Sequence, residues 1–322
     1  MALIFHGVRG FLNTPIKSEY FLNKIELIWS EFEKNNLNND NFLTYLKKNI
    51  QVGSKSRDPI HYPIGNCSTC IEYTGKESEV LFFDAGTGLR RASLDKRSHL
   101  YSEDFQKGKG RINLFMTHSH WDHILGLLET PSLYRPGNQF HIHSVHKNME
   151  ERIEALFHKY NFPVPFDTVR YNLRFHEIPH DEPFNLGQLK ITHLAQSHPG
   201  GSFAYKIEDG NQSTIFSTDT DGSSFSNMDY QNCFFTNADT VILDAQFSPD
   251  EYEDKAHIGH QDCIKACNLA HKCGVKNLYL FHFHPDYSDV KIIELLKQSQ
   301  EYLKSLNSTT KVHLAIEGLM LD

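Results

Sequence analysis

The feature that most restricts this chain is a cluster of metal-ligand residue types placed directly after an apolar strand. Residues 112–116 are short, apolar and partly β-branched, as a buried strand would be, and Thr117 leads from them into His-Ser-His-Trp-Asp-His at positions 118–123. These six positions offer three imidazoles and one carboxylate, which are donors that zinc, manganese and iron accept. The pattern therefore predicts a divalent-metal site at the carboxyl end of a strand, in preference to a solvated patch of surface histidines.

Short apolar runs alternate with helical periodicity along the rest of the chain. The runs predicted as strands are 80–83, 112–116, 139–143, 189–194, 202–207, 214–217, 241–243, 277–281 and 312–316. The predicted helices are 18–34, 149–159, 261–272 and 289–306, and Ser288 is the expected N-cap of the last. This alternation predicts sheets with helices packed outside them. We expect one domain over residues 1–322, with a helical insertion at about residues 15–60.

Composition excludes several classes of protein. The formal net charge of −8 argues against a general nucleic-acid binder. No apolar stretch approaches the roughly 18 residues of a membrane span, and the first residues have no leader character, so a cytoplasmic protein is expected. The six cysteines fit small buried thiols, because the lone Cys67/Cys70 pair lacks the second pair that a structural zinc site needs. Histidine, with 20 residues, is the unusual component.

Four further segments complete a pattern that resembles the metallo-β-lactamase fold superfamily. They are Phe83-Asp84-Ala85-Gly86-Thr87-Gly88, Gln196-Ser197-His198-Pro199-Gly200-Gly201, Ser217-Thr218-Asp219-Thr220 and Leu280-Phe281-His282. The resemblance runs from about His6 to the C-terminus. It implies a four-layer αββα sandwich with the metal ions at one edge of its two sheets.

The resemblance also implies a ligand set for two ions. His118, His120 and His198 would hold one ion, Asp122, His123 and His282 the other, and Asp219 would lie between them. His284 is the rival for the last place, and His282 is preferred because it directly follows a strand. Asp84 would orient a ligand imidazole, the alternative being that it caps the turn at Gly86 and Gly88.

This donor set contains nitrogen and oxygen but no thiolate, which favours zinc and leaves manganese and iron open. Two divalent ions that share a water lower its pKa and clamp the attacking and leaving oxygens. That chemistry suits phosphoester, lactam, thioester and lactone hydrolysis equally.

Three details narrow the substrate. In the resemblance, a bridging Asp219 is typical of the phosphodiesterase, glyoxalase II and lactonase branches, and Ser119 stands where flavodiiron enzymes carry a glutamate ligand. The segment around Asp244 and Gly259-His260-Gln261 resembles ribonuclease Z and its small phosphodiesterase relatives. There a histidine held by an acidic residue faces the leaving group as an acid or as a stabiliser of phosphate charge. Asp122, Asp244 and His260 are therefore the expected catalytic residues, with His257 an alternative to His260.

The expected function is hydrolysis of a small phosphodiester, such as a cyclic nucleotide or a cyclic phosphate. The chain lacks the long Gly/Pro-rich arm with which ribonuclease Z grips tRNA, and its acidity argues against a structured nucleic acid as partner. Lactone or thioester hydrolysis and RNA 3′-end cleavage remain as alternatives, as does a catalytically silent metal protein that senses nucleotides. Trp121 is expected to wall the substrate pocket, and a homodimer is left open.

Overall fold

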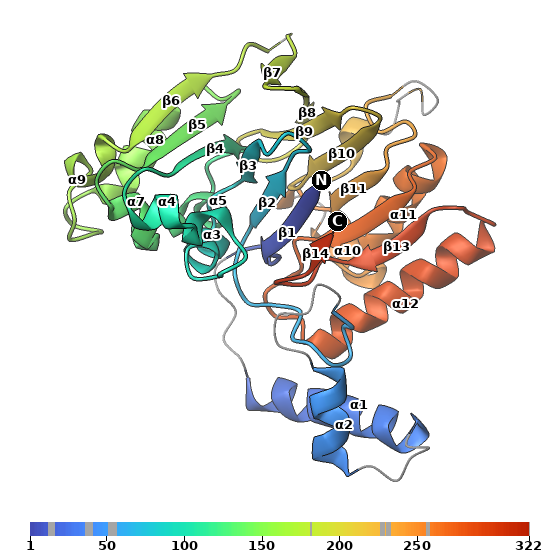
Figure 1. Ribbon diagram of the computed structural model, residues 1–322. Helices are drawn as coiled ribbons and strands as arrows, with labels where there is room; N and C mark the ends of the chain where they lie inside the picture. The colour runs from blue at the N-terminus through green and yellow to red at the C-terminus, as the bar shows by residue number, and fades with distance from the viewer. Residues whose placement is uncertain are drawn as a thin grey trace.

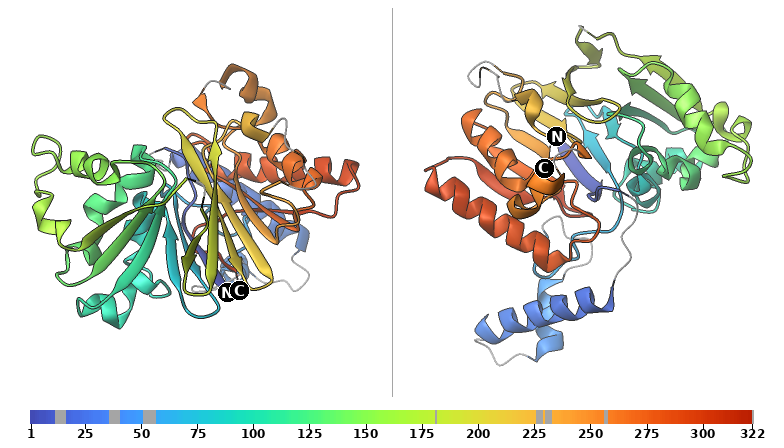
Figure 2. Two further views of the ribbon diagram at one scale, coloured as in Figure 1. Left: turned by 90° about the horizontal axis from the view of Figure 1, so that it is seen from above. Right: turned by 180° about the vertical axis from the view of Figure 1, so that it is seen from behind.

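Two seven-stranded sheets pack face to face in the computed structural model of the chain, and helices cover their outer faces (Figures 1 and 2). The structure describes residues 1–11, 17–35, 41–50, 57–180, 182–225, 229, 233–255 and 258–321. The layers form the αββα sandwich that the sequence predicted.

The first sheet has the strand order β14-β1-β2-β3-β4-β5-β6. Its strands are β1 (Ala2–Gly7), β2 (Cys70–Thr74), β3 (Val80–Phe83), β4 (Arg111–Met116), β5 (Gln139–Ser144), β6 (Leu173–Glu177) and β14 (Met320–Leu321). Pairing is antiparallel from β14 to β3 and parallel from β3 to β6. Strands β3 and β4 therefore end at the same edge of the sheet.

The second sheet repeats this arrangement in the order β13-β12-β11-β10-β9-β8-β7. Its strands are β7 (Phe184–Leu186), β8 (Leu189–Gln196), β9 (Ser202–Asp209), β10 (Gln212–Ser217), β11 (Thr240–Asp244), β12 (Asn277–Phe281) and β13 (Lys311–Leu314). Strands β10 to β13 are parallel, so the residues that follow β10, β11 and β12 meet at one edge.

Helices lie outside the sheets and in the connections. They are α1 (Ser18–Asn35), α2 (Phe42–Asn49), α3 (Thr87–Ala92), α4 (Glu103–Gln106), α5 (Trp121–Ile124), α6 (Gly126–Glu129), α7 (Pro131–Tyr134), α8 (Met149–Glu154), α9 (Asp167–Arg170), α10 (Pro249–Lys255), α11 (Cys263–Lys272) and α12 (Asp289–Ser305), with 3₁₀ turns η1 (His99–Tyr101), η2 (Ala155–Phe157) and η3 (Ser223–Phe225). The described part of residues 15–60 forms α1 and α2, which project from the sandwich (Figure 1). No helix among the described residues is both long and apolar enough to cross a bilayer.

Two predicted helices differ at their ends. The helix expected over 149–159 stops at Glu154 and tightens into η2, which brings Phe157 into the core against Phe166 at a ring distance of 5.5 Å. The helix expected from residue 261 begins at Cys263, because the Asp262 carboxylate accepts from the first free amides, those of Ile264 and Lys265. The N-cap role of Ser288 is confirmed by its bond from the Lys291 amide.

The core between the sheets is aromatic. The Phe83 ring lies 5.7 Å from that of Phe115 and 5.6 Å from that of Phe216, and the latter lies 5.6 Å from Phe281. These residues end or nearly end their strands. Packing of these rings therefore holds the strand ends of both sheets in a fixed relation, at the edge where the polar motifs follow.

Candidate metal centre

Three strands are followed, within two residues, by a residue whose backbone is left-handed. Asp84 after β3, Asp219 after β10 and His282 after β12 have φ values of 59°, 57° and 64°. Aspartate and histidine adopt this conformation more often than most residues, although it is uncommon for any residue other than glycine. Each such residue costs on the order of 1 kcal/mol and persists where the surrounding structure enforces it, which is a frequent property of functional sites.

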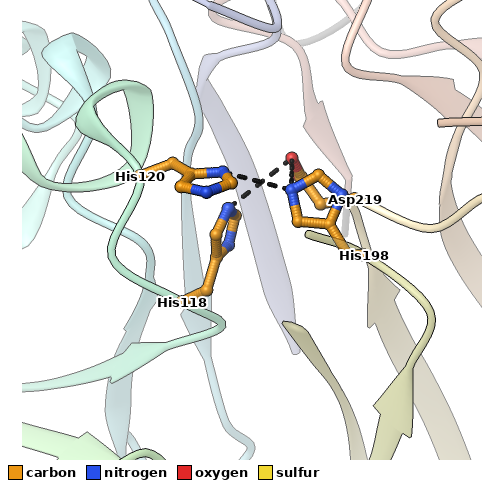
Figure 3. Close-up of side chains that lie close together, drawn as sticks. All are labelled: His118, His120, His198 and Asp219. Atoms are coloured by element: carbon orange, nitrogen blue, oxygen red, sulfur yellow. Dashed lines mark hydrogen bonds and ion pairs between the residues drawn. The ribbon is translucent and has the colours of Figure 1, made fainter. Parts of the chain in front are cut away.

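The first group of candidate ligands is His118, His120, His198 and Asp219, whose side chains converge from both sheets (Figure 3). The Nε2 atoms of His118 and His198 lie 3.7 and 3.6 Å from Asp219 Oδ1. His198 Nε2 also lies 3.1 Å from His120 Nδ1. Three imidazole nitrogens and a carboxylate oxygen so close together form a nitrogen-rich site for one cation.

The second group is Asp122, His123, His282 and again Asp219. His123 Nε2 lies 3.3 Å from Asp122 Oδ2 and 3.3 Å from Asp219 Oδ2, and His282 Nε2 lies 3.3 Å from Asp122 Oδ2. Asp219 thus turns one carboxylate oxygen to each group. This is the arrangement required of a residue that bridges two ions.

The buried nitrogen atoms of these groups test whether metal ions fit. Nε2 of His118, of His123 and of His282 are all buried without a hydrogen-bond partner among the described residues. Buried polar atoms almost always have a hydrogen-bond partner, because an atom without one loses its hydration and gains no bond in return. The glycine at position 10 also leaves space beside His282 Nε2, since a Cβ atom added there would lie 2.7 Å from this nitrogen. The donor set and its unpaired nitrogens fit two divalent ions.

The structure places His282, and not His284, in this cluster. The His284 ring instead packs 5.7 Å from Phe247 and 5.2 Å from Tyr287, and its Nδ1 accepts from the Asp286 amide. His282 directly follows β12, so the strand fixes its position, whereas His284 lies two residues further along the loop.

Asp84 is buried behind the cluster. Its Oδ2 accepts from His123 Nδ1 at 2.8 Å, and its carboxylate also accepts from the amide and the hydroxyl of Thr117. The bond to Nδ1 fixes the His123 tautomer and leaves Nε2 free for an ion. The Asp84 carboxylate therefore orients the imidazole of His123 and does not cap the turn at Gly86 and Gly88.

His260 and Asp244 form the expected pair, with His260 Nδ1 donating to Asp244 Oδ2 at 2.7 Å. His260 Nε2 lies 3.9 Å from Asp219 Oδ1, at the first group of ligands. Burial lowers the pKa of His260, but the charge and hydrogen bond of Asp244 outweigh it and raise that pKa to about 9. The imidazole is therefore able to carry a proton at neutral pH. His257, the alternative, lies outside the described residues.

A cavity of about 480 Å³ opens over this cluster. It is lined by Phe11, Ser119, His120, Trp121, Asp122, His198, Ile258 and His260. Trp121 is at the wall, as predicted. Phe11 and Ile258 were not singled out in the sequence, because neither belongs to a recognisable motif.

Comparison with known proteins extends these observations. A family model described as a beta-lactamase superfamily domain matches residues 80–283. Ribonuclease Z of Nitrosopumilus maritimus is 25% identical over 313 residues, which cover 84% of this chain and 99% of that protein. Among solved structures, the metallo-beta-lactamase fold protein YhfI from Bacillus subtilis aligns with a TM-score of 0.62 at 16% identity, covering 99% of this chain and 98% of its own. A diphosphatase from the PhnP family aligns with a TM-score of 0.58 at 18% identity, covering 100% and 97%.

Proposed function

Since the chain belongs to the beta-lactamase superfamily and is a metal-dependent hydrolase, we propose that it cleaves a small phosphodiester, such as a cyclic nucleotide or a cyclic phosphate. The observation that carries the proposal is the combination of a two-ion donor set with a histidine held by a carboxylate beside it. The names of its relatives, a ribonuclease and a diphosphatase, support scission at phosphorus.

His118, His120 and His198 would hold one ion, Asp122, His123 and His282 the other, and Asp219 would bridge them. Zinc is the expected metal, and manganese or iron would suit the same donors. Bound ions supply Lewis acidity at a phosphoryl oxygen and lower the pKa of a water molecule towards neutrality.

His260 provides the proton in this proposal. Asp244 holds Nδ1, so Nε2 is the atom available to the cavity, and a protonated Nε2 donates to the departing alkoxide oxygen. Asp244 also accepts from the Asp219 amide at 3.0 Å. One carboxylate therefore positions both the acid and the bridging ligand.

A small substrate is favoured by the size and charge of the molecule. A cavity of about 480 Å³ suits a mononucleotide-sized ligand, and a net charge of −8 disfavours a polyanion. RNA 3′-end cleavage is the second candidate, because the similarity to a ribonuclease Z extends over 99% of that protein.

The test begins with bis(p-nitrophenyl) phosphate and protein reloaded with Zn²⁺ or Mn²⁺ after chelation. We expect metal-dependent release of p-nitrophenol that His120→Ala reduces by about a thousandfold, because one ion loses a ligand. The matched control is His158→Ala, an exposed histidine away from the cluster, which should retain activity. Equal activity in the His120→Ala protein would contradict the proposal.

A substrate panel separates the alternatives. We expect turnover of cyclic mononucleotides or cyclic phosphates and none of lactones or glutathione thioesters. Cleavage of precursor tRNA at a higher kcat/KM than any small diester would support the RNA nuclease. Turnover of lactones or thioesters alone would support that hydrolase class, and tight nucleotide binding without turnover in any metal would support a silent sensor.

A further inference from the structure

Three large apolar side chains are exposed together at the mouth of the catalytic cavity. Phe11 is 67% exposed, Trp121 66% and Ile258 41%, and all three line the cavity that also contains His120 and Asp122. Single exposed apolar residues are ordinary, but a group of them at one cavity marks a binding surface. They come from the segment after β1, from α5 and from the segment before His260, so their meeting results from the fold and not from one local sequence.

Phe11 reaches this place at an energetic cost. Its φ is 65°, a left-handed conformation that is an outlier for a bulky residue. The conformation is held on both sides, because the Phe11 amide donates to Asp122 Oδ2 at 2.8 Å and the Gly10 amide donates to the Phe283 carbonyl at 3.0 Å. The exposed ring buries too little area to offset the strain by packing. A strained residue that presents its ring to a cavity indicates a ligand for that ring.

Trp121 is fixed with respect to the ligand cluster by its position in the chain. It lies between His120 and Asp122, one in each ligand group, and it begins α5. Its indole is the largest flat apolar surface at the mouth. The motif therefore fixes the Trp121 backbone between two ligands, and the 66% exposed indole can turn about its side-chain bonds at the wall of the cavity.

We propose that Phe11, Trp121 and Ile258 bind a flat unsaturated ring in the substrate, so that the preferred substrates are nucleoside phosphodiesters and not alkyl or sugar phosphodiesters without a base. This inference rests on the proposed phosphodiesterase function. Stacking of a base on an aromatic side chain strengthens binding about 5- to 150-fold and is tolerant of base identity, since every base has a π-face. The three side chains offer one hydrogen-bond donor, the indole N–H, so little discrimination among bases is expected.

Fluorescence gives a direct measurement, because Trp29 is the other of the two tryptophans. In Zn²⁺-supplemented Trp29→Phe protein, emission reports Trp121 alone. We expect adenosine 5′-monophosphate to quench it and to bind at least tenfold more tightly than ribose 5-phosphate, which lacks only the base. Trp121→Ala and Phe11→Ala, measured by calorimetry, should each weaken the nucleotide about tenfold and leave ribose 5-phosphate within twofold.

Two controls guard this reading. Trp121→Phe keeps an aromatic face and should retain most of the nucleotide affinity. Tyr171→Ala removes an aromatic ring that is 80% exposed but does not line the cavity, and should change nothing. Equal affinity for nucleotide and sugar phosphate, no binding of either, or Ala variants with unchanged nucleotide affinity would each overturn the inference.

Failure of this inference can be distinguished from failure of the proposed function. Turnover of bis(p-nitrophenyl) phosphate, with equal affinity for ligands with and without a base, would overturn only the proposal that Phe11, Trp121 and Ile258 bind a ring. A preference for the base without turnover of any phosphodiester would overturn the proposed function and leave a nucleotide-binding site.

Discussion

At the scale of single residues, the contacts of His260 specify what its removal should do. The side chain bonds to Asp244 but belongs to neither of the two ligand groups that share Asp219. We expect His260→Asn to lower kcat by about 10²- to 10⁴-fold while two metal equivalents remain, because proton donation is lost and the ligands are not. Metal analysis together with steady-state kinetics measures both effects.

The leaving group provides a stricter criterion for His260. An alkoxide needs a proton on departure more than p-nitrophenolate does, so the loss in His260→Asn should be larger for a cyclic nucleotide than for bis(p-nitrophenyl) phosphate. A loss of the same size for both substrates would contradict an acid role and indicate charge stabilisation instead.

The Asp84 carboxylate gives a second prediction at this scale. Asp84→Asn removes the negative charge from the partner of His123 Nδ1, so we expect a 10- to 100-fold loss of metal affinity in competition with a chelator. Asp209→Asn is the matched control, since Asp209 is also buried and accepts from Tyr73 and Lys76 far from the cluster. Similar metal affinities in the two variants would exclude the orienting role of Asp84.

At the scale of elements, strands β5 and β6 contain a stack of histidines beside Phe115 of β4 that should make the fold sensitive to acid. The His143 ring lies 4.7 Å from Phe115 and 4.8 Å from His176, and His141 Nδ1 is 2.9 Å from His176 Nε2. Burial, followed by the charges of His176, His141 and Arg111, lowers the pKa of His143 to about 3. Burial and the charges of Arg111, His176 and Arg174 lower that of His141 to about 4.

The sign of the pH effect follows from these shifts. Unfolded histidine binds a proton near pH 6.5, whereas these two bind one only near pH 3 to 4 when folded, so the unfolded state takes up more protons between these values. Stability should therefore fall as pH drops below about 6.5. We expect His143→Phe to remove about 2 kcal/mol of the loss between pH 7.5 and pH 5.

Urea unfolding at the two pH values measures this effect, with a chelator present so that pH-dependent binding of metal does not contribute. His158→Phe is the control, because that histidine is exposed. The same pH dependence in wild type and His143→Phe would refute the assignment.

The strands whose bounds the sequence predicted correctly are those whose residues are mostly buried. Strands β3 and β12 were predicted with the bounds they have, because both are short apolar runs with a neighbouring strand on each side. Strand β6 was missed, since only Leu173 is buried at this sheet edge and Arg174, His176 and Glu177 are exposed polar residues. Strand β2 was missed because it contains Glu72, which is buried through its bond with His6.

The site was predictable where a donor follows a strand, as His118, Asp219 and His282 do. The place of Phe11 was not predictable. It depends on a left-handed backbone at Phe11, and the residue types at positions 10 and 11 do not indicate that conformation. Ile258 is placed by the path of its loop and not by any pattern of neighbours.

At the scale of the whole molecule, the candidate ligands connect the two sheets. His118, His120, Asp122 and His123 follow β4 in the first sheet, whereas His198, Asp219 and His282 follow β8, β10 and β12 in the second. Ions bound here would link two layers that otherwise meet through apolar packing and a few hydrogen bonds, such as those from Tyr205 to the Met116 carbonyl and from Tyr73 to Asp209. Loss of the ions should therefore destabilise the entire sandwich and not one loop.

Calorimetric melting with and without a chelator tests this link. With free metal at about a thousand times its Kd, binding adds about 4 kcal/mol to the free energy of unfolding, so chelation should lower Tm by several degrees and reloading should restore it. His120→Ala protein should show a smaller difference. Identical melting of loaded and chelated wild-type protein would mean that the cluster does not hold ions tightly.

The left-handed backbone at Asp84, Asp219 and His282 costs on the order of 1 kcal/mol at each position. Glycine would relieve this strain, but at Asp84 it would also remove the carboxylate that accepts from His123 and from the amide and hydroxyl of Thr117. A buried donor left without its acceptor costs about 1–3 kcal/mol, so Asp84→Gly should lower the free energy of unfolding even in metal-free protein. Selection for thermal survival alone would therefore retain this aspartate in descendants that never meet a metal ion.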